Sequence, residues 1–528
     1  MGKIAKYLNQ LIVGNVFDAP EILEEYATDR SVLRVKPKFV AFPESTEDVR
    51  KLMRFFDQIA AKDIPVSVTA RGSGMDEGGA DLTNGVVVST EKLNKMLELD
   101  PRERLVHVQA GITLKELNTA LSAVGLMIPI GGHDSETIGG LISNAPIDLY
   151  AAKYGGIMEY VERVEVILAN GECLQTERLK RYAVAKKAAE KTLEGDSYRK
   201  MAKILKEKTD LVQKIGLNKR NLVGYPGVAR VPKRETMDLM PLFGGAQGTL
   251  GIVTEAILKV IPMKNKPERL VATFKELRSA VKFAEAVKRL RPREINLYDL
   301  KIVQEARETG KNLDGVIKRL ESGFVVFVSF DERAGSCLKK VASIRDKFPR
   351  TAKFIFESAE NKQTLNEFEN ALASYLNHTK GGERVPVLTD FYLPEESLEA
   401  FLADLKILEE KLGLDLALYG SYATGIYSLR PKFKLDEADF NKKVATFLRA
   451  GAYVIDRQGG LLAGGTPEGR LKAVVTNGEI LEPEKSLYEE IKKIFDPNGI
   501  LNPEVKLGAS SKFTLTHFRE AGLNKVVV

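Results

Sequence analysis

The stretch Arg71-Gly72-Ser73-Gly74-Met75-Asp76-Glu77-Gly78-Gly79-Ala80 directly follows an apolar run, Ile64-Pro-Val-Ser-Val-Thr69, that is typical of a β-strand. Glycines have no Cβ, so their backbone N–H groups can approach a phosphate closely, and a nest of such groups binds anions. The stretch is not a G-x-G-x-x-G fingerprint, because its third glycine is displaced by one position. Taken alone, it would be interpreted as an ordinary tight loop.

Two further glycine-rich loops follow along the chain. The first reads Ile128-Pro129-Ile-Gly-Gly-His133-Asp-Ser-Glu-Thr137-Ile-Gly139-Gly140-Leu-Ile-Ser-Asn144-Ala145, and the second reads Gly244-Gly-Ala-Gln247-Gly-Thr-Leu-Gly251-Ile252-Val-Thr254. Tyr154-Gly155 and a strand-like run that ends in Ala169-Asn-Gly-Glu172 lie between them. Because the three glycine-rich loops occur in this order, it is improbable that they are only unrelated turns.

Short apolar runs alternate with amphipathic helices from Pro37 to about Lys264, and longer units follow a plausible linker at 263–267. Ser45-Thr-Glu-Asp48 resembles a capping box before a helix that runs to about Ala61. Strands are predicted at 39–42, 64–69, 86–88, 105–108, 161–168, 270–274 and 324–330. Helices are predicted at 114–121, 280–290, 338–348 and 398–412, and in the tail from 485. The pattern predicts an α+β protein whose second part is a two-layer domain.

The composition is that of a globular protein with substantial cores. The 528 residues are 44% hydrophobic and 29% charged, and the net charge is +7. The sequence contains neither a nucleic-acid-binding motif nor an apolar run long enough to span a bilayer. The N-terminus lacks the features of an export signal, and the two cysteines, Cys173 and Cys337, are expected to be reduced thiols. We therefore expect a cytoplasmic protein, with at most a peripheral contact at the inner membrane face.

Taken in their order along the chain, these loops resemble those of the FAD-binding domain of the vanillyl-alcohol-oxidase and para-cresol-methylhydroxylase (PCMH) type. Within that superfamily the chain is most similar to the D-lactate dehydrogenase and glycolate oxidase subunit group. Tyr26-Ala-Thr-Asp29-Arg-Ser31 and Asp496-Pro-Asn-Gly-Ile-Leu-Asn502-Pro503 also match that group. The resemblance implies two α+β subdomains that bind FAD and an α+β cap domain whose sheet is covered by helices. The expected parts are a helical segment (1–35), the FAD-binding domain (36–265), the cap (266–480) and a C-terminal segment that returns to the FAD domain (481–528).

The resemblance also implies roles for single residues. Arg71 to Asp76 would cradle the pyrophosphate, the second loop would line the cofactor, the third loop would contact its adenine and ribose side, and Asn502 would return to the flavin region. The implied FAD-binding residues are Arg71, Gly72, Ser73, Gly74, Met75, Asp76, Pro129, Thr137, Gly139, Gly140, Asn144, Ala145, Gly251, Ile252, Thr254 and Asn502.

Several positions depart from the family pattern. Ala246-Gln247 stands where relatives usually have Ser-Glu, and Pro146 stands where a glycine is common. Met75 occupies a site at which some relatives carry a histidine bonded covalently to the flavin, and a thioether cannot form that bond. His133, a loop histidine beside Asp134, is better interpreted as a hydrogen-bonding residue. We therefore expect FAD to be bound non-covalently.

The catalytic centre departs furthest from the pattern. Metal-using relatives hold a divalent ion with two histidines and a glutamate, and a neighbouring histidine removes the substrate's hydroxyl proton. Ser421 and Ser428 stand at the two histidine positions, and Gly465 and Thr466 replace the glutamate and the base. Hydroxyls and a glycine are poor ligands for zinc or manganese. Nor can the chain's four histidines, His107, His133, His378 and His517, rebuild the site at those positions. We predict no metal.

Other polar residues remain near these positions. Arg430 and Arg470 could bind a carboxylate or phosphate, because the guanidinium fork fits such anions. Tyr419, Tyr422, Tyr427 and Glu468 could supply a proton acceptor. Equally, the tyrosines could pack in strands and Arg470 could pair with Glu468.

Three functions stay open from the sequence. The first is an FAD-linked oxidoreductase that oxidises a small hydroxy acid or alcohol by hydride transfer without a metal, and passes electrons to a quinone, an electron-transfer protein or oxygen. The second is a non-redox flavoenzyme similar to alkylglycerone-phosphate synthase, whose histidine-rich segments are missing here. The third is a flavin-binding electron-transfer subunit without its own catalysis.

Overall fold

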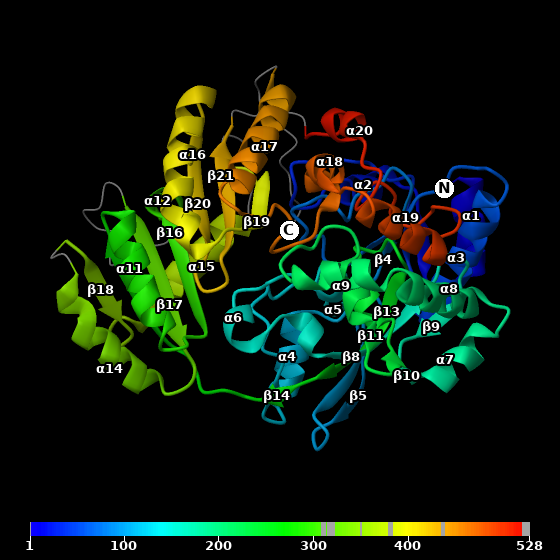
Figure 1. The fold of residues 1–528 in the computed structure, drawn as a ribbon, viewed down its shortest axis with the longest axis horizontal. Helices are drawn as coiled ribbons and strands as arrows, with labels where there is room; N and C mark the ends of the chain where they lie inside the picture. The colour runs from blue at the N-terminus through cyan, green and yellow to red at the C-terminus, as the bar shows by residue number, and fades with distance from the viewer. Residues whose placement is uncertain are drawn as a thin grey trace.

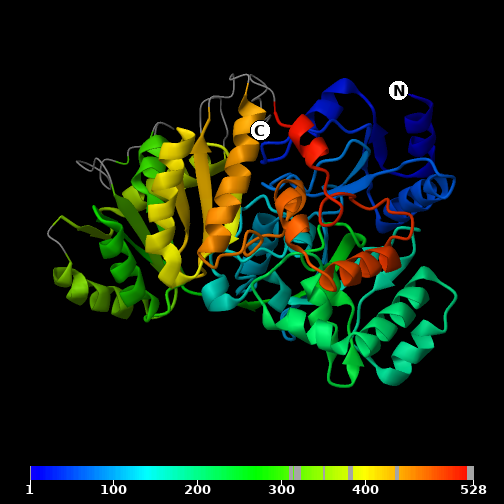
Figure 2. The ribbon, with the colours of Figure 1, turned by 45° about the horizontal axis from the view of Figure 1, so that its top comes forward.

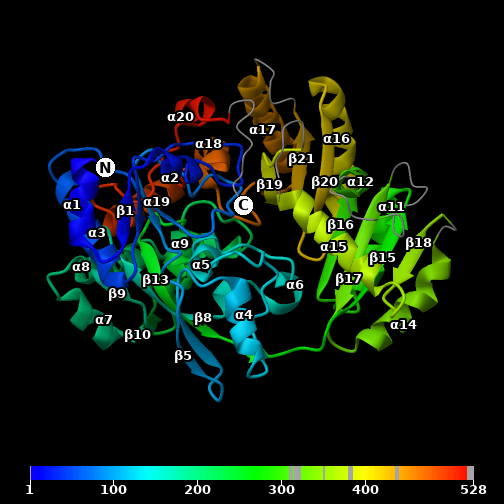
Figure 3. The ribbon, with the colours of Figure 1, turned by 180° about the vertical axis from the view of Figure 1, so that it is seen from behind.

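The computed structural model describes residues 2–307, 313, 323–348, 351–377, 384–433 and 439–519. Two bodies lie side by side in Figure 1, and the chain crosses between them once along the lower edge, after β14 (Ile261–Pro262). The body that holds β1 to β14 also receives the C-terminal helices, as the view from behind shows (Figure 3). The crossing begins at the linker expected at 263–267, which lies outside helices and strands.

The first sheet carries the glycine-rich turn. Its order is β1 (Asn15–Phe17), β2 (Phe39–Phe42), β4 (Val86–Ser89) and β3 (Val68–Arg71). The last two pairings are parallel, and α3 (Thr46–Ala60) begins at Ser45, whose side chain accepts a hydrogen bond from the backbone N–H of Asp48. The helix at 46–60 is therefore as predicted, but β1 was missed. The strand expected at 64–69 is displaced to β3, because Val68 pairs with the returning segment at Ile500 and Asn502.

The second sheet explains why the third glycine-rich loop lies beside the first two. Its order is β5 (Met96–Asp100), β6 (Leu105–Gln109), β13 (Ile252–Lys259), β8 (Val161–Ile167) and β9 (Cys173–Gln175). The central strand, β13, comes more than 80 residues after its neighbour β8 and is antiparallel to both β6 and β8. It brings Gly251 and Thr254 next to α5 (Ile138–Asn144).

A small helical region between β9 and β13 was not predicted. It consists of α7 (Arg181–Ala188), α8 (Leu193–Glu207), α9 (Thr209–Leu217) and α10 (Met240–Phe243), with the short strands β10 (Leu179–Lys180), β11 (Pro232–Lys233) and β12 (Thr236–Met237). The C-terminal helix α19 (Glu484–Phe495) packs on α8, so its apolar side chains join the core of this domain rather than that of the cap.

The cap is built on a seven-stranded antiparallel sheet. Its order is β18 (Lys353–Phe356), β15 (Glu268–Phe274), β17 (Phe324–Phe330), β16 (Glu294–Asp299), β20 (Asp415–Ser421), β21 (Ile426–Lys432) and β19 (Leu388–Tyr392). One face is covered by α11 (Leu277–Lys288), α14 (Ala334–Ile344), α16 (Leu398–Leu412) and α17 (Phe440–Arg457). Helices α16 and α17 stand next to each other over β20 and β21 (Figure 2).

The other face of the cap sheet is divided between two neighbours. Helices α12 (Leu300–Arg307) and α15 (Lys362–Asn377) cover its middle with an apolar cluster. Towards β19 to β21 it carries buried polar residues and meets the FAD-binding body. Of the catalytic residues predicted on β20 and β21, Tyr419 and Arg430 therefore lie on this face, at the domain boundary. Within the described part of the chain, no helix is long and apolar enough to cross a membrane.

Candidate functional site

The first glycine-rich loop is organised as an anion nest. Asp76 closes the loop, because its carboxylate accepts hydrogen bonds from the backbone N–H groups of Gly78 (3.0 Å) and Ala80 (3.3 Å). Within the described residues, the backbone N–H groups from Gly72 to Met75 and that of Glu77 show no hydrogen bond, whereas the backbone N–H of Asp76 donates to the Asp81 carboxylate. Unpaired N–H groups that converge on one loop are ready to bind phosphate oxygens.

The three glycine-rich loops meet around one small cavity of about 40 Å³. Six of the predicted FAD-binding residues line it: Arg71, Gly72, Gly139, Gly140, Asn144 and Gly251. Sequence reasoning missed Ser143, Gln247 and Gly248, which line it as well. Gln247 lies in the left-handed region (φ 51°) and its side-chain amide donates to Asn144. The positive φ at a non-glycine residue was not readable from the sequence.

Other predicted FAD-binding residues hold the cavity's walls in place. Thr137 caps α5 by accepting from the backbone N–H of Gly140, and the hydroxyl of Thr254 donates to Glu165. Asn502 donates to the backbone oxygens of Ala80 and Gln247, so it fastens the first loop to the third. The cavity lining does not include the remaining ones, which are loop, helix-cap or strand residues: Ser73, Gly74, Met75, Asp76, Pro129, Ala145 and Ile252.

Buried carboxyl groups surround the anion nest. Burial is the main cause that raises the pKa of Asp81 to about 7, although the Arg71 guanidinium opposes the shift. Burial and the charges of Asp29 and Asp81 raise the pKa of Asp76 well above its usual range. A raised pKa favours the neutral form of these carboxyl groups, and the neutral form repels a bound phosphate less than the ionised form does.

Arg430 and Tyr419 meet at the boundary between the two bodies. Arg430 lies on β21 with only 2% of its side chain exposed, and its Nη2 donates to Glu77 Oε1 at 2.6 Å and to the Tyr419 hydroxyl at 3.1 Å. Arg30 binds the same carboxylate oxygen at 2.8 Å. A carboxylate from the glycine-rich loop is thus held between two guanidinium groups. The Nε of Arg430 is buried and, within the described residues, has no partner.

A second polar cluster includes Ser428 and Thr466, two residues that the sequence analysis expected at the positions of the relatives' metal ligand and base. Asp390, on β19, accepts from the Ser428 hydroxyl at 3.2 Å and from the Thr466 hydroxyl at 3.3 Å. Lys472, on α18 (Gly469–Glu479), donates to that Thr466 hydroxyl at 2.9 Å. Asp390 and Lys472 were not selected from the sequence. An acid inside the otherwise mainly apolar run 385–393 was the available signal for Asp390.

The other predicted catalytic residues lie elsewhere. Tyr427 points to the opposite face of β21 and packs in the cap core, and Tyr422 donates to Glu395 on the helical side. Glu468 is fully buried with Lys506 and accepts from the backbone N–H of Gly224. Arg470 donates to the backbone oxygens of Leu82 and Pro503. The structure thus brings together Tyr419 and Arg430, but not Tyr427, Glu468 or Arg470.

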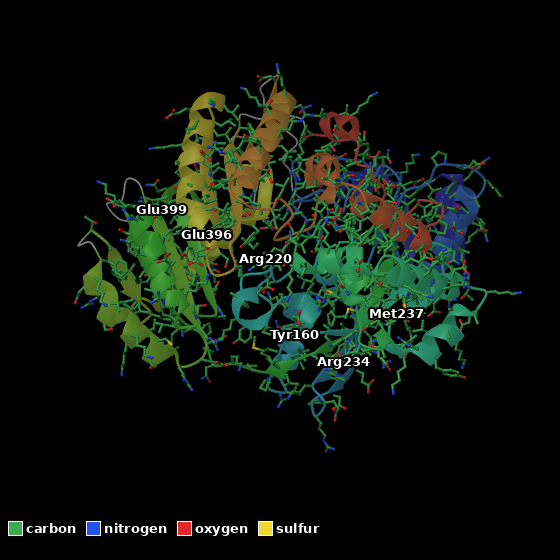
Figure 4. All side chains as sticks on the ribbon, viewed as in Figure 1. Tyr160, Arg220, Arg234, Met237, Glu396 and Glu399 are labelled. Carbon is green, nitrogen blue, oxygen red and sulfur yellow. The ribbon has the colours of Figure 1, made fainter. Side chains whose placement is uncertain are left out.

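Arg220 and Tyr392 form a stacked pair at the boundary between the two bodies. In Figure 4, Arg220 lies between the two bodies, while Glu396 and Glu399 lie on the cap. The guanidinium of Arg220 stacks over the Tyr392 ring at 4.9 Å, next to Asp390 on β19.

His133 contacts Ser135 through Nδ1. Of the other histidines, His378 lies outside the described residues. No group of three or more His, Cys, Asp or Glu side chains suited to a metal occurs in the part of the chain that the structure describes.

Comparison with known families agrees with this geometry. Residues 37–177 match the family described as FAD binding domain, and residues 265–505 match the family described as FAD linked oxidases, C-terminal domain. The chain belongs to the FAD-linked oxidases. The prediction of FAD as cofactor is thereby confirmed, and the nest and the cavity provide donors that fit a pyrophosphate.

Curated relatives of this FAD-linked oxidase are similar along most of its length. It is 26% identical over 498 residues to D-2-hydroxyglutarate dehydrogenase of Pseudomonas putida, covering 90% of this chain and 49% of that protein. It is 25% identical to D-lactate dehydrogenase of Archaeoglobus fulgidus, covering 88% and 90%, and 23% identical to D-lactate dehydrogenase of Anaerostipes hadrus, covering 92% of each. The chain therefore spans about half the length of the D-2-hydroxyglutarate dehydrogenases it matches.

Solved structures confirm the fold of this FAD-linked oxidase. 4-Ethylphenol oxidase from Gulosibacter chungangensis superposes with a TM-score of 0.70 at 16% identity, over 96% of this chain and 97% of that one. p-Cresol methylhydroxylase superposes with a TM-score of 0.66 at 14% identity, over 95% of each chain. The predicted α+β fold of the PCMH type is thus correct.

Proposed function

We propose that this protein is an FAD-dependent dehydrogenase that oxidises the CH–OH group of a small hydroxy acid at the boundary between the FAD-binding body and the cap. The observation that carries the proposal is the position of Arg430. It is buried, it is held by Glu77 of the glycine-rich loop, and its Nε lacks a partner among the described residues. A buried donor without an acceptor is costly, so an oxygen that reaches it is bound with a net gain.

Arg430 provides the anchor for the substrate carboxylate. Glu77 and the Tyr419 hydroxyl fix the orientation of its guanidinium, and Arg30 shares the charge of Glu77. A fixed guanidinium holds a carboxylate with directional, charge-assisted hydrogen bonds. When bound, FAD supplies the oxidant that accepts two electrons with the hydrogen of the C–H bond. The chain's own task is to orient the substrate and to accept its hydroxyl proton.

The relatives indicate the class of substrate. D-lactate and D-2-hydroxyglutarate, which appear in the names of similar dehydrogenases, are both 2-hydroxy acids and both carry a carboxylate that fits Arg430. We propose non-covalent FAD, no metal ion, and a quinone, an electron-transfer protein or oxygen as the final acceptor. We also propose a cytoplasmic location with at most a peripheral membrane contact. Neither the non-redox transfer nor the electron-transfer subunit is favoured by a specific contact.

An anaerobic flavin-reduction screen tests the proposal. D-lactate, D-2-hydroxyglutarate, glycolate, aldonolactones and sugar alcohols are each mixed with the purified holoprotein, and the flavin absorbance is followed. We expect 2-hydroxy acids to bleach the flavin and the uncharged alcohols to do so poorly, because only the acids can use Arg430. A panel that leaves the flavin oxidised throughout would refute the assignment.

A further inference from the structure

Asp390 combines several features that a structural acid does not need. Its backbone lies in the left-handed region (φ 51°), which is strained for a residue with a Cβ. Its carboxylate accepts from two hydroxyls, Ser428 and Thr466, that come from different parts of the chain. The backbone N–H of Asp390 also donates to the Ser428 hydroxyl at 2.9 Å. The acid is therefore held in one position by three hydrogen bonds.

Asp390 is deep in the protein and yet reachable. Asp390 and Thr466 both keep part of their surface exposed, whereas Ser428 is 2% exposed. Half-exposed Tyr392, with Arg220 stacked on it, borders the same space from the side. Gly465, next to Thr466, accepts at its backbone oxygen from Ile147, which follows the second glycine-rich loop. Asp390 thus lies where the second glycine-rich loop approaches the cap sheet and is not fully closed off from solvent.

Lys472 supplies a positive charge to this acid through Thr466. Its Nζ donates to the backbone oxygen of Thr466 at 3.2 Å and to the hydroxyl at 2.9 Å. Because the hydroxyl accepts from Lys472, its own hydrogen is free to point at Asp390. The side chain of Lys472 is 1% exposed, so its charge is weakly screened by solvent.

We propose that Asp390 is the proton acceptor of the hydroxy-acid oxidation and that Lys472, acting through Thr466, is the positioning residue that keeps it ionised. The inference rests on the proposed function. In the step, the substrate's O–H bond breaks and its proton moves to the Asp390 carboxylate. The C–H bond breaks as its hydrogen and two electrons pass to FAD, and the C=O bond forms. The substrate is oxidised by two electrons and FAD is reduced by two.

The surrounding charges suit this role. Burial and the charge of Glu77 raise the pKa of Asp390, while Lys472 and the two hydroxyls oppose the rise. Glu136, on the second loop, and Tyr419, on β20, also feel the charge of Asp390. Burial lowers the pKa of Lys472, and the charges of Asp390, Asp76, Glu468 and Glu77, which face it, oppose that shift and favour its charged form. A carboxylate with a raised pKa is a stronger base than an exposed one. Burial also raises the pKa of Tyr419, so this phenol stays protonated and is a poor acceptor.

Stopped-flow reduction of the flavin tests the acceptor directly. For Asp390→Asn we expect the limiting rate constant to fall at least about 100-fold while the substrate dissociation constant and the FAD content stay close to wild type, since general-base loss acts on the chemical step. Thr466→Val should slow the step and Thr466→Ser should restore it. Asp346→Asn, at a side chain that is 88% exposed, is the matched control.

The role of Lys472 is tested by pH. The base must be ionised, so the rate constant rises with pH through the pKa of Asp390. Lys472→Met removes the opposing positive charge, raises that pKa and should move the rising limb to higher pH by about one unit or more. Infrared difference spectra give a second measurement that needs no turnover. A carboxylic-acid C=O band should titrate in the oxidised holoprotein, vanish in Asp390→Asn and shift its midpoint upward in Lys472→Met.

The outcomes separate this inference from the proposed function. If no hydroxy acid reduces the flavin of the wild-type protein, the proposed function itself is refuted. Wild-type reduction combined with an unchanged rate constant in Asp390→Asn would refute the acceptor and leave the function standing. A Lys472→Met profile and band midpoint that coincide with wild type would show that Lys472 is only structural.

Discussion

Glu77 and Arg430 are joined by a 2.6 Å ion pair across the domain boundary, although 353 positions separate them in the chain. The pair connects the loop that carries the anion nest with the cap strand that carries the proposed substrate anchor. Since Glu77 is 13% exposed and Arg430 is 2% exposed, the pair is largely shielded from solvent. The carboxylate that belongs to the glycine-rich loop thus also orients the guanidinium of the cap strand.

Arg430→Lys tests the anchor. Lysine keeps the charge but loses the guanidinium fork, so the dissociation constant for a 2-hydroxy acid should rise about 10- to 100-fold, as expected for one charge-assisted hydrogen bond. Anaerobic titration of flavin reduction measures it. The exposed Arg102→Lys serves as control. Equal affinity in the variant and the wild type would exclude Arg430 from substrate binding.

Gly72→Ala tests the cofactor cradle. A Cβ at Gly72 would lie 2.3 Å from the Oγ1 of Thr137, so the first loop must move away from α5. We expect the purified variant to hold clearly less FAD per chain, measured from the ratio of flavin to protein absorbance. Gly478→Ala is the control, because a Cβ there meets no atom within 4 Å. Full FAD content in Gly72→Ala would show that the loop tolerates this shift.

Glu468→Gln distinguishes catalysis from stability. The charge of Glu468 neutralises Lys506, and both side chains are fully buried. Breaking a buried pair leaves an uncompensated charge and should lower the free energy of unfolding by about 3 kcal/mol, measured with urea. The folded fraction should still reduce its flavin at the wild-type rate. Lost reduction at unchanged stability would instead support Glu468 as the proton acceptor.

The raised pKa of Glu136 predicts that the stability of the protein depends on pH. Burial is the largest cause that raises its pKa from 4.5 to about 7. Between these values the folded state binds more protons than the unfolded state, so this group makes stability fall as pH rises from about 4.5 to about 7. Glu136→Gln should therefore reduce the difference between urea midpoints at pH 5 and pH 8. The exposed Glu98→Gln should leave it unchanged, and an identical difference in Glu136→Gln would contradict the shift.

Treatment with a chelator tests the prediction that the protein needs no metal ion. With Ser421 and Ser428 at the positions of the relatives' histidines, dialysis against a chelator should leave flavin reduction by a 2-hydroxy acid unchanged. Elemental analysis of the dialysed protein should find no stoichiometric zinc or manganese. A retained equivalent of either ion, or activity that returns only with added metal, would overturn the prediction.

Local patterns predicted many elements well. The helix 398–412 and the strands 39–42 and 324–330 have the predicted bounds, because their apolar spacing is regular and turn residues border them. The displaced strand β3 and the missed β1 depend on partners elsewhere in the chain, such as Ile500 and Phe42. Tyr427 was misplaced for a related reason, since the face that a strand residue occupies is set by the register with β20.

The sequence by itself determined the cofactor class, because glycine-rich loops require particular residue types at particular positions. It also predicted the loss of a histidine metal site, because hydroxyls and a glycine are poor metal ligands. Only the tertiary structure decided which polar residues act together. Asp390, Thr466 and Lys472 lie far apart along the chain or on different elements, and hydrogen bonds between them form only once β19 and α18 pack at the domain boundary. Directional bonds need fixed distances, and the fold alone sets those distances.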